Sequence, residues 1–161
     1  MSRIYLSPIL VTLLLAALLA VSTGGSGHPG QTSNSNAPPY HSHLPAEPLP
    51  PTLDASPFAG DRVAFISYAL AARTKSILYQ VPCYCPCNRQ HGHESLLDCF
   101  TGKHGAKCGI CEKEVIFCYR ESRKGRTAPQ IRDDIRAGKA WKIDLKLETE
   151  RLSSHLDACK R

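Results

Sequence analysis

Apolar residues recur at helical spacing in three segments of the chain. The first is predicted over residues 59–79, where Asp61 can cap a helix and one face carries Phe65, Tyr68, Ala69, Ala72 and Ser76. Pro82 ends this helix because it lacks a backbone donor and disfavours helical geometry at the residue before it. A second helix is predicted from Cys111 to Ser122. A third opens at Thr127, with Pro129 in its first turn, and ends at Gly138.

The segments around these helices are less regular. Residues 82–109 contain four glycines and are predicted as a loop-rich connection. Apolar residues occupy alternate positions over residues 141–147, as in a strand, whereas the spacing of Leu145, Leu152 and Leu156 fits a helix. The structure of the C-terminal extension (139–161) therefore stays open. The pattern as a whole predicts a small, mainly α domain over residues 58–138, with about three helices packed around a loop-borne cysteine site.

The N-terminal part predicts export followed by a tether. Arg3 precedes a charge-free apolar run from Ile9 to Val21, and small residues follow from Ser22. This is the pattern of an export signal over residues 1–23, or of an uncleaved membrane anchor. Residues 24–57 are rich in Pro, Ser and Gly and are predicted to be a disordered linker. We therefore expect a secreted, periplasmic or cell-envelope protein.

Charge and composition narrow the function. The net charge of +6 lies in residues 101–161, where 15 basic side chains are interspersed with 9 acidic ones and aromatic residues are few. This is a solvated surface, and we expect no nucleic-acid partner. The 8 cysteines in 161 residues exclude a large α/β enzyme and indicate a small domain organised by sulfur.

Three cysteines stand at alternate positions, at Cys83, Cys85 and Cys87. On an extended strand their sulfurs would point to one face. Cysteines this close rarely form disulfides with one another, because the geometry is strained over so short a loop. The triplet therefore needs other partners: metal ions, or disulfides with Cys99, Cys108 and Cys111. Both remain open.

Cys108 and Cys111 form a C-x-x-C pair at the start of the second predicted helix, where backbone N–H groups favour the thiolate. Such a pair occurs in zinc half-sites and in thiol–disulfide oxidoreductases. Cys118 lies about 10 Å further along the helix, so it either extends a cluster of several ions or is a buried small side chain. Cys159 is isolated, and is predicted to be a free thiol or a partner of Cys118.

Six or seven thiols exceed the four ligands of a mononuclear zinc site, and soft sulfur ligands select Cu(I) first and zinc next. His93 is the best-placed nitrogen ligand, between Cys87 and Cys99, whereas His91 and His104 are weaker candidates. We therefore predict a multinuclear thiolate site that uses Cys83, Cys85, Cys87, His93, Cys99, Cys108, Cys111 and Cys118.

The stretch Pro82-Cys83-Tyr84-Cys85-Pro86-Cys87 resembles a bacterial family of exported proteins and lipoproteins named for its PCYCGC motif. The likeness continues through Gly92-His93-Glu94-Ser95, Asp98-Cys99-Phe100 and Cys108-Gly109-Ile110-Cys111 to the helix at Pro129. The resemblance implies an extracytoplasmic cysteine-rich domain that binds metal through the six motif cysteines and His93. Pro86 replaces the glycine of the motif, and no lipobox precedes the linker.

These observations predict an extracytoplasmic protein that holds Cu(I), or zinc, for storage, scavenging or delivery, with metal ions and a metal-donor or metal-acceptor protein as partners. Contact with a membrane would come only from an uncleaved N-terminal segment. A disulfide-stapled binding domain and a redox protein acting through Cys108 and Cys111 are the alternatives. No paired carboxylates or Ser/His/Asp set suggests hydrolysis, so we do not expect an enzyme.

Overall fold

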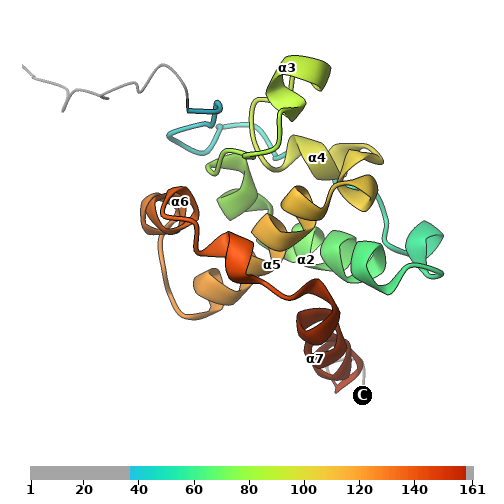
Figure 1. The fold of residues 1–161 in the computed structure, drawn as a ribbon. Coiled ribbons are helices and arrows are strands. Elements are labelled where there is room, and N and C mark those ends of the chain that lie inside the picture. The colour runs from blue at the N-terminus through green and yellow to red at the C-terminus, as the bar shows by residue number, and fades with distance from the viewer. Residues whose placement is uncertain (1–36, 159–161) are drawn as a thin grey trace, which may run out of the picture. The chain divides into compact units, whose positions relative to one another are not determined.

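A computed structural model of the chain describes residues 37–158, which belong to one compact unit, and within these residues every regular element is a helix (Figure 1). This confirms the predicted mainly α fold. In chain order the elements are η2 (Ser56–Phe58), α2 (Arg62–Tyr79), α3 (Cys87–His91), α4 (Asp98–Thr101), η3 (His104–Lys107), α5 (Gly109–Arg123), α6 (Ala128–Arg136), η4 (Ala140–Lys142) and α7 (Leu145–Ala158). Among the described residues no helix is both long and apolar enough to span a membrane. The predicted export signal and Cys159 lie outside them.

The core lies mainly between α2 and α5 (Figure 1). Asp61 caps α2 as predicted, since its carboxylate accepts a hydrogen bond from the backbone N–H of Ala64 at 3.1 Å. Both helices bury one face, and the largest fully buried side chains include Tyr68, Leu70 and Ile116. These two helices support the connection that carries most of the cysteines.

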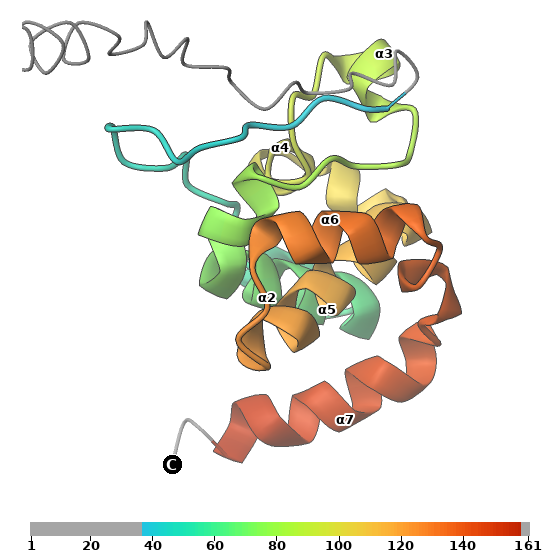
Figure 2. The ribbon, with the colours of Figure 1, turned by 90° about the vertical axis from the view of Figure 1, so that its left-hand side faces the viewer.

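The third predicted helix is α6. Thr127 is its N-cap, and the Thr127 backbone N–H donates to the side chain of Gln130 at 3.0 Å. Pro129 lies in the first turn, and Gly138, with φ of 81°, follows the end of the helix. In Figure 2, α6 runs across the middle of the domain and α7 runs along its bottom, below α5.

The connection between α2 and α5 is more structured than predicted. It contains α3, α4 and the 3-10 turn η3, so Cys87 and Cys99 lie on short helices and not in loops. Asp98 shapes the turn before α4, since its carboxylate accepts from the backbone N–H groups of Glu94 and Ser95 at 2.7 and 3.0 Å. These single turns are too short to produce a periodic signal in the sequence.

Residues 37–57 differ from the predicted disordered linker. They form no regular helix before η2, yet they follow the surface of the domain. The backbone N–H of Leu53 donates to the carbonyl of Phe100 at 2.8 Å, and the ring of His41 stacks on Tyr79 with centroids 3.9 Å apart. The Arg132 guanidinium lies 4.2 Å from the centroid of the Tyr40 ring. Scattered aromatic contacts hold this segment on the domain, and its Pro-rich composition gives no sign of them.

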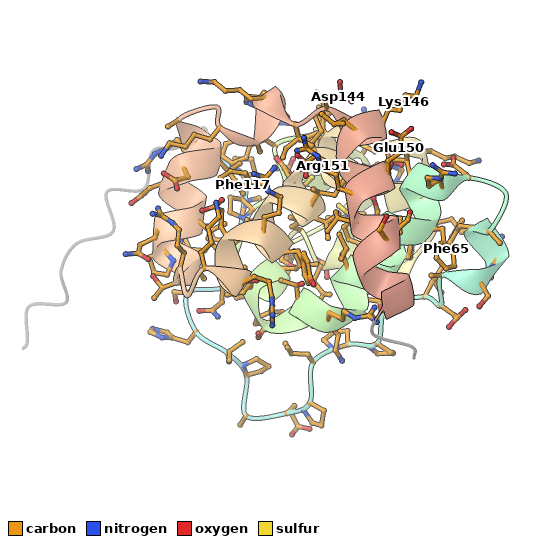
Figure 3. The ribbon with its side chains drawn as sticks, turned by 90° about the horizontal axis from the view of Figure 1, so that it is seen from below. Phe65, Phe117, Asp144, Lys146, Glu150 and Arg151 are labelled. Carbon is orange, nitrogen blue, oxygen red and sulfur yellow. The ribbon has the colours of Figure 1, made fainter. Side chains whose placement is uncertain are left out.

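The C-terminal extension is helical, so the strand alternative for residues 141–147 is wrong. The carboxylate of Asp144 accepts from the backbone N–H of Leu147 at 3.0 Å and starts α7. Leu145, Thr149 and Leu152 face the domain at helical spacing, with Thr149 and Leu152 buried. In Figure 3, α7 lies between the labelled Phe65 of α2 and Phe117 of α5. The cysteine-bearing α3 and α4 lie at the end of the domain away from α7 (Figure 2).

Candidate metal centre

Four separate parts of the chain bring the motif cysteines together. Cys83 and Cys85 lie in the extended stretch after α2, and Cys87 is the first residue of α3. Cys99 lies in α4, while Cys108 is the N-cap of α5 and Cys111 lies in its first turn. Cys108 is half-buried and the other five are buried, with at most 3 % of each exposed. The six sulfurs thus form one site inside the core.

The sulfur atoms are close enough to hydrogen-bond. The Cys83 thiol lies 3.3 Å from the sulfur of Cys85 and 3.4 Å from that of Cys111. The Cys85 and Cys111 sulfurs are 3.7 Å apart, as are those of Cys87 and Cys99. The predicted convergence of the Cys83, Cys85 and Cys87 sulfurs is confirmed, although Cys87 reaches it from the start of a helix.

The seven described cysteines are all unpaired. Even the 3.3 Å between the Cys83 and Cys85 sulfurs is far longer than the about 2.05 Å of a disulfide bond. The structure therefore presents a set of thiols, and the disulfide framework considered from the sequence is not formed among the described residues.

Two histidines complete the site. Nδ1 of His93 lies 3.4 Å from the Cys99 sulfur, and Nε2 of His104 lies 3.5 Å from the Cys85 sulfur. Both rings are partly buried. The exposed His91 ring has its centroid 5.5 Å from that of His93 and 4.8 Å from that of His104. His93 was the better-placed candidate in the sequence, yet both histidines contact a motif sulfur, because His104 at the start of η3 lies beside Cys85.

The potential ligand atoms fall into overlapping sets of four whose members all lie within 4.8 Å of one another. One set contains only sulfur, one combines His104 with three cysteines, and one combines both histidines with two cysteines. The sets are Cys83, Cys85, Cys87 and Cys99; then Cys85, His104, Cys108 and Cys111; then Cys87, His93, Cys99 and His104. Thiolate and imidazole are the donors that soft and borderline metal ions prefer, so the arrangement is consistent with a metal-binding site.

Hydrogen bonds within the cluster divide the six thiols into two groups. The pKa of Cys85 is lowered to about 2 and that of Cys87 to about 4, with the nearby Cys83 thiol as the largest cause for both. The pKa of Cys111 is also lowered, first by the neighbouring thiol of Cys108 and then by that of Cys83. The pKa values of Cys83, Cys99 and Cys108 are raised. The shifts at Cys85, Cys87 and Cys111 therefore favour the thiolate, which is the form that coordinates metal.

Glu114 is a site residue that the sequence analysis missed. Its side chain is fully buried on α5, and its Oε1 accepts a hydrogen bond from the backbone N–H of Tyr84 at 3.0 Å. Burial raises its pKa well above the ordinary value. By fixing the peptide between Cys83 and Cys85, it positions both sulfurs. Glu114 follows Cys111 by three residues, so the sequence alone places both residues on the same face of the helix. That spacing was the one sign in the sequence that Glu114 could belong to the site.

Cys118 lies apart from the described ligand sets. It is fully buried on α5, and burial raises the pKa of its thiol. None of the sets of potential ligands among the described residues includes it. Its surroundings match a small buried side chain, the second of the two interpretations drawn from the sequence. The pairing suggested with Cys159 falls outside the described residues.

The fold and site together define a small all-helical protein with a buried cluster of cysteines and histidines. The chain belongs to the family described as proteins of unknown function with a PCYCGC motif, whose family model matches residues 11–140. This confirms the family indicated by the motif. No curated protein and no solved structure matches the chain.

Proposed function

We propose that this protein binds soft metal ions, Cu(I) ahead of zinc, in its cysteine cluster, and that it does so outside the cytoplasm for storage, scavenging or delivery. The observation that carries the proposal is the overlap of several four-ligand sets around one buried group of six sulfurs. A structural role alone would not require six cysteines and two histidines to converge on one place. Thiolate and imidazole are donors that bind soft and borderline metal ions.

Sulfur content favours Cu(I) because this ion prefers thiolates, whereas the two imidazoles also suit zinc. Delivery would need access to the site from solvent. The partly exposed rings of His93 and His104 and the exposed ring of His91 lie on the solvent side of the buried sulfurs. The extracytoplasmic location rests on the apolar run and small residues of the N-terminal segment.

The redox alternative fits less well. In a C-x-x-C redox protein the accessible first cysteine is the low-pKa nucleophile. Here the half-exposed Cys108 has a raised pKa, and the lowered pKa belongs to the buried Cys111. The direction of these shifts does not favour attack by the accessible thiol.

The test is to express the chain with its N-terminal segment, purify it from an oxidising compartment, and measure copper, zinc and free thiols on one sample. We expect bound metal together with eight thiols after denaturation and chelation. A Cys111→Ala variant should bind less metal than the parent, whereas Cys118→Ala, which removes a buried sulfur outside the sets, should bind as much. Three disulfides and no metal would contradict the proposal and support a disulfide-stapled domain.

A further inference from the structure

Taking metal binding as its basis, we infer that the cluster holds two metal ions and that the sulfur of Cys85 bridges them. The first ion would lie among Cys83, Cys85, Cys87 and Cys99, and the second among Cys85, His104, Cys108 and Cys111. All six motif cysteines are then used, and only Cys85 belongs to both ions.

The number of donors requires more than one ion. A tetrahedral d10 ion such as zinc accepts four protein ligands, whereas six cysteines and two histidines meet here. A single ion in the all-sulfur set would leave two motif sulfurs without a metal, and a single ion in the set with His104 would leave three. Two ions that share one sulfur need seven donors, which the two sets supply.

The spacing of the sulfurs fits this arrangement. A tetrahedral ion with bonds of about 2.3 Å to sulfur separates its ligand atoms by about 3.8 Å. Cys87 and Cys99, which would share the first ion, have their sulfurs 3.7 Å apart, and so do Cys85 and Cys111, which would share the second. The distance from the Cys85 sulfur to Nε2 of His104 is 3.5 Å. The Cys83 and Cys85 sulfurs, which are 3.3 Å apart, would have to separate by about 0.5 Å to share the first ion.

Bond chemistry selects Cys85 as the bridge. The second and third sets also share one ligand, His104. An imidazole nitrogen has a single lone pair and can bind one ion, whereas a thiolate sulfur has several and can bind two. Two sets can therefore share Cys85 and cannot share one nitrogen of His104. In this arrangement His104 binds the second ion, and His93 keeps its contact with the Cys99 sulfur outside the metal shell.

The experiment loads the reduced full-length protein with 113Cd2+, a tetrahedral NMR-active ion. We expect two equivalents to bind tightly and to give two resonances, one for four sulfurs and one for three sulfurs and a nitrogen. Each should be split by coupling to the other through the shared sulfur. One equivalent, or two resonances without mutual coupling, would overturn the bridged pair while leaving metal binding intact. No bound cadmium would instead refute the proposed function.

Variants test the assignment of each ligand. Cys85→Ser should abolish the coupling and weaken the second equivalent by more than about tenfold, since even outer-shell substitutions cost 10–100-fold in affinity. His104→Gln should shift one resonance and leave the other, which keeps the test informative even where Cys85→Ser fails to fold. His93→Gln and Cys118→Ala should preserve two coupled resonances. If His93→Gln lost a resonance and His104→Gln kept both resonances unchanged, the assignment of His104 as the nitrogen ligand would be refuted.

Discussion

Among the described glycines, Gly105 is the one where an added side chain would meet the closest neighbours, and Gly105→Ala tests this packing. A Cβ atom there would lie 2.8 and 2.9 Å from two ring carbons of Phe100 and 3.0 Å from the carbonyl oxygen of Cys99. Carbon atoms in contact prefer about 3.5–4.0 Å. The new methyl group would therefore overlap the ring by more than half an ångström.

The Phe100 ring cannot move away from the new methyl group easily. Phe100 is fully buried, and its ring packs edge-on against Tyr68 with centroids 5.2 Å apart. Tyr68 in turn stacks on Phe58 at 4.2 Å and donates to the carbonyl of Gly102 at 2.6 Å. Overpacking of such a core costs about 1–3 kcal/mol. For a domain of this size, each kcal/mol lowers Tm by roughly 4 °C, so we expect a drop of about 4–12 °C.

The assay is thermal and urea unfolding of the reduced, metal-free full-length protein, with Gly102→Ala as the matched control. Gly102 lies in the same connection, and a Cβ there would meet nothing within 4 Å. We expect the control to lie within about 0.5 kcal/mol of the parent, as for a surface substitution. A Gly105→Ala protein as stable as the control would refute the packing described around Phe100. Relief of the clash would also move η3, which carries His104. The metal affinity of the set Cys85, His104, Cys108 and Cys111 should therefore fall in Gly105→Ala and stay unchanged in Gly102→Ala.

Three other predictions follow from the site and its surroundings. Metal loading at pH 7 should release fewer protons than six ordinary thiols would, because the pKa values of Cys85, Cys87 and Cys111 are lowered. Calorimetry in buffers of different ionisation enthalpy measures the number of protons released, and a release of about six or more would contradict the prediction. Cys118→Ala should lower the free energy of unfolding by about 1 kcal/mol in denaturant titrations, with metal stoichiometry unchanged. A lower stoichiometry would show that Cys118 is a ligand. Tyr40→Ala removes the aromatic partner of the Arg132 guanidinium and should lower the free energy of unfolding by about 0.5–1 kcal/mol. It should also speed proteolysis within residues 37–57. An unchanged cleavage rate would show that this contact does not hold the segment on the domain.

The helices were predictable where periodicity and caps coincided. Asp61 and Thr127 mark the starts of α2 and α6, and both signals are local. The start of α7 was missed because Asp144, its capping residue, follows apolar positions that also alternate as in a strand. The contacts of residues 37–57 depend on pairs such as His41 and Tyr79, which are distant in sequence. A pattern within one segment cannot reveal such pairs.

The candidate site was likewise predictable only where it depends on local sequence. The spacing of Cys83, Cys85 and Cys87 indicated their convergence, because it depends on local backbone geometry. The nearness of His104 to Cys85 depends on how η3 packs, which the sequence does not express. Glu114 was visible as a position on the Cys111 face of α5, but its hydrogen bond to the Tyr84 peptide was not.

The placement of the cluster couples metal binding to folding. The cysteines belong to the same buried core as Leu96, Phe100 and Val115, so the ligands are in position only when the domain is folded. An ion that binds the folded chain alone stabilises it by RT ln(1 + [L]/Kd), about 2.7 kcal/mol at a hundred times Kd. The site joins the connection before α3, the turn of α4 and the start of α5, which are otherwise linked by short elements. Metal loading should therefore protect amides in residues 83–111 from hydrogen exchange more than those of α6 and α7, because only the former lie between ligands.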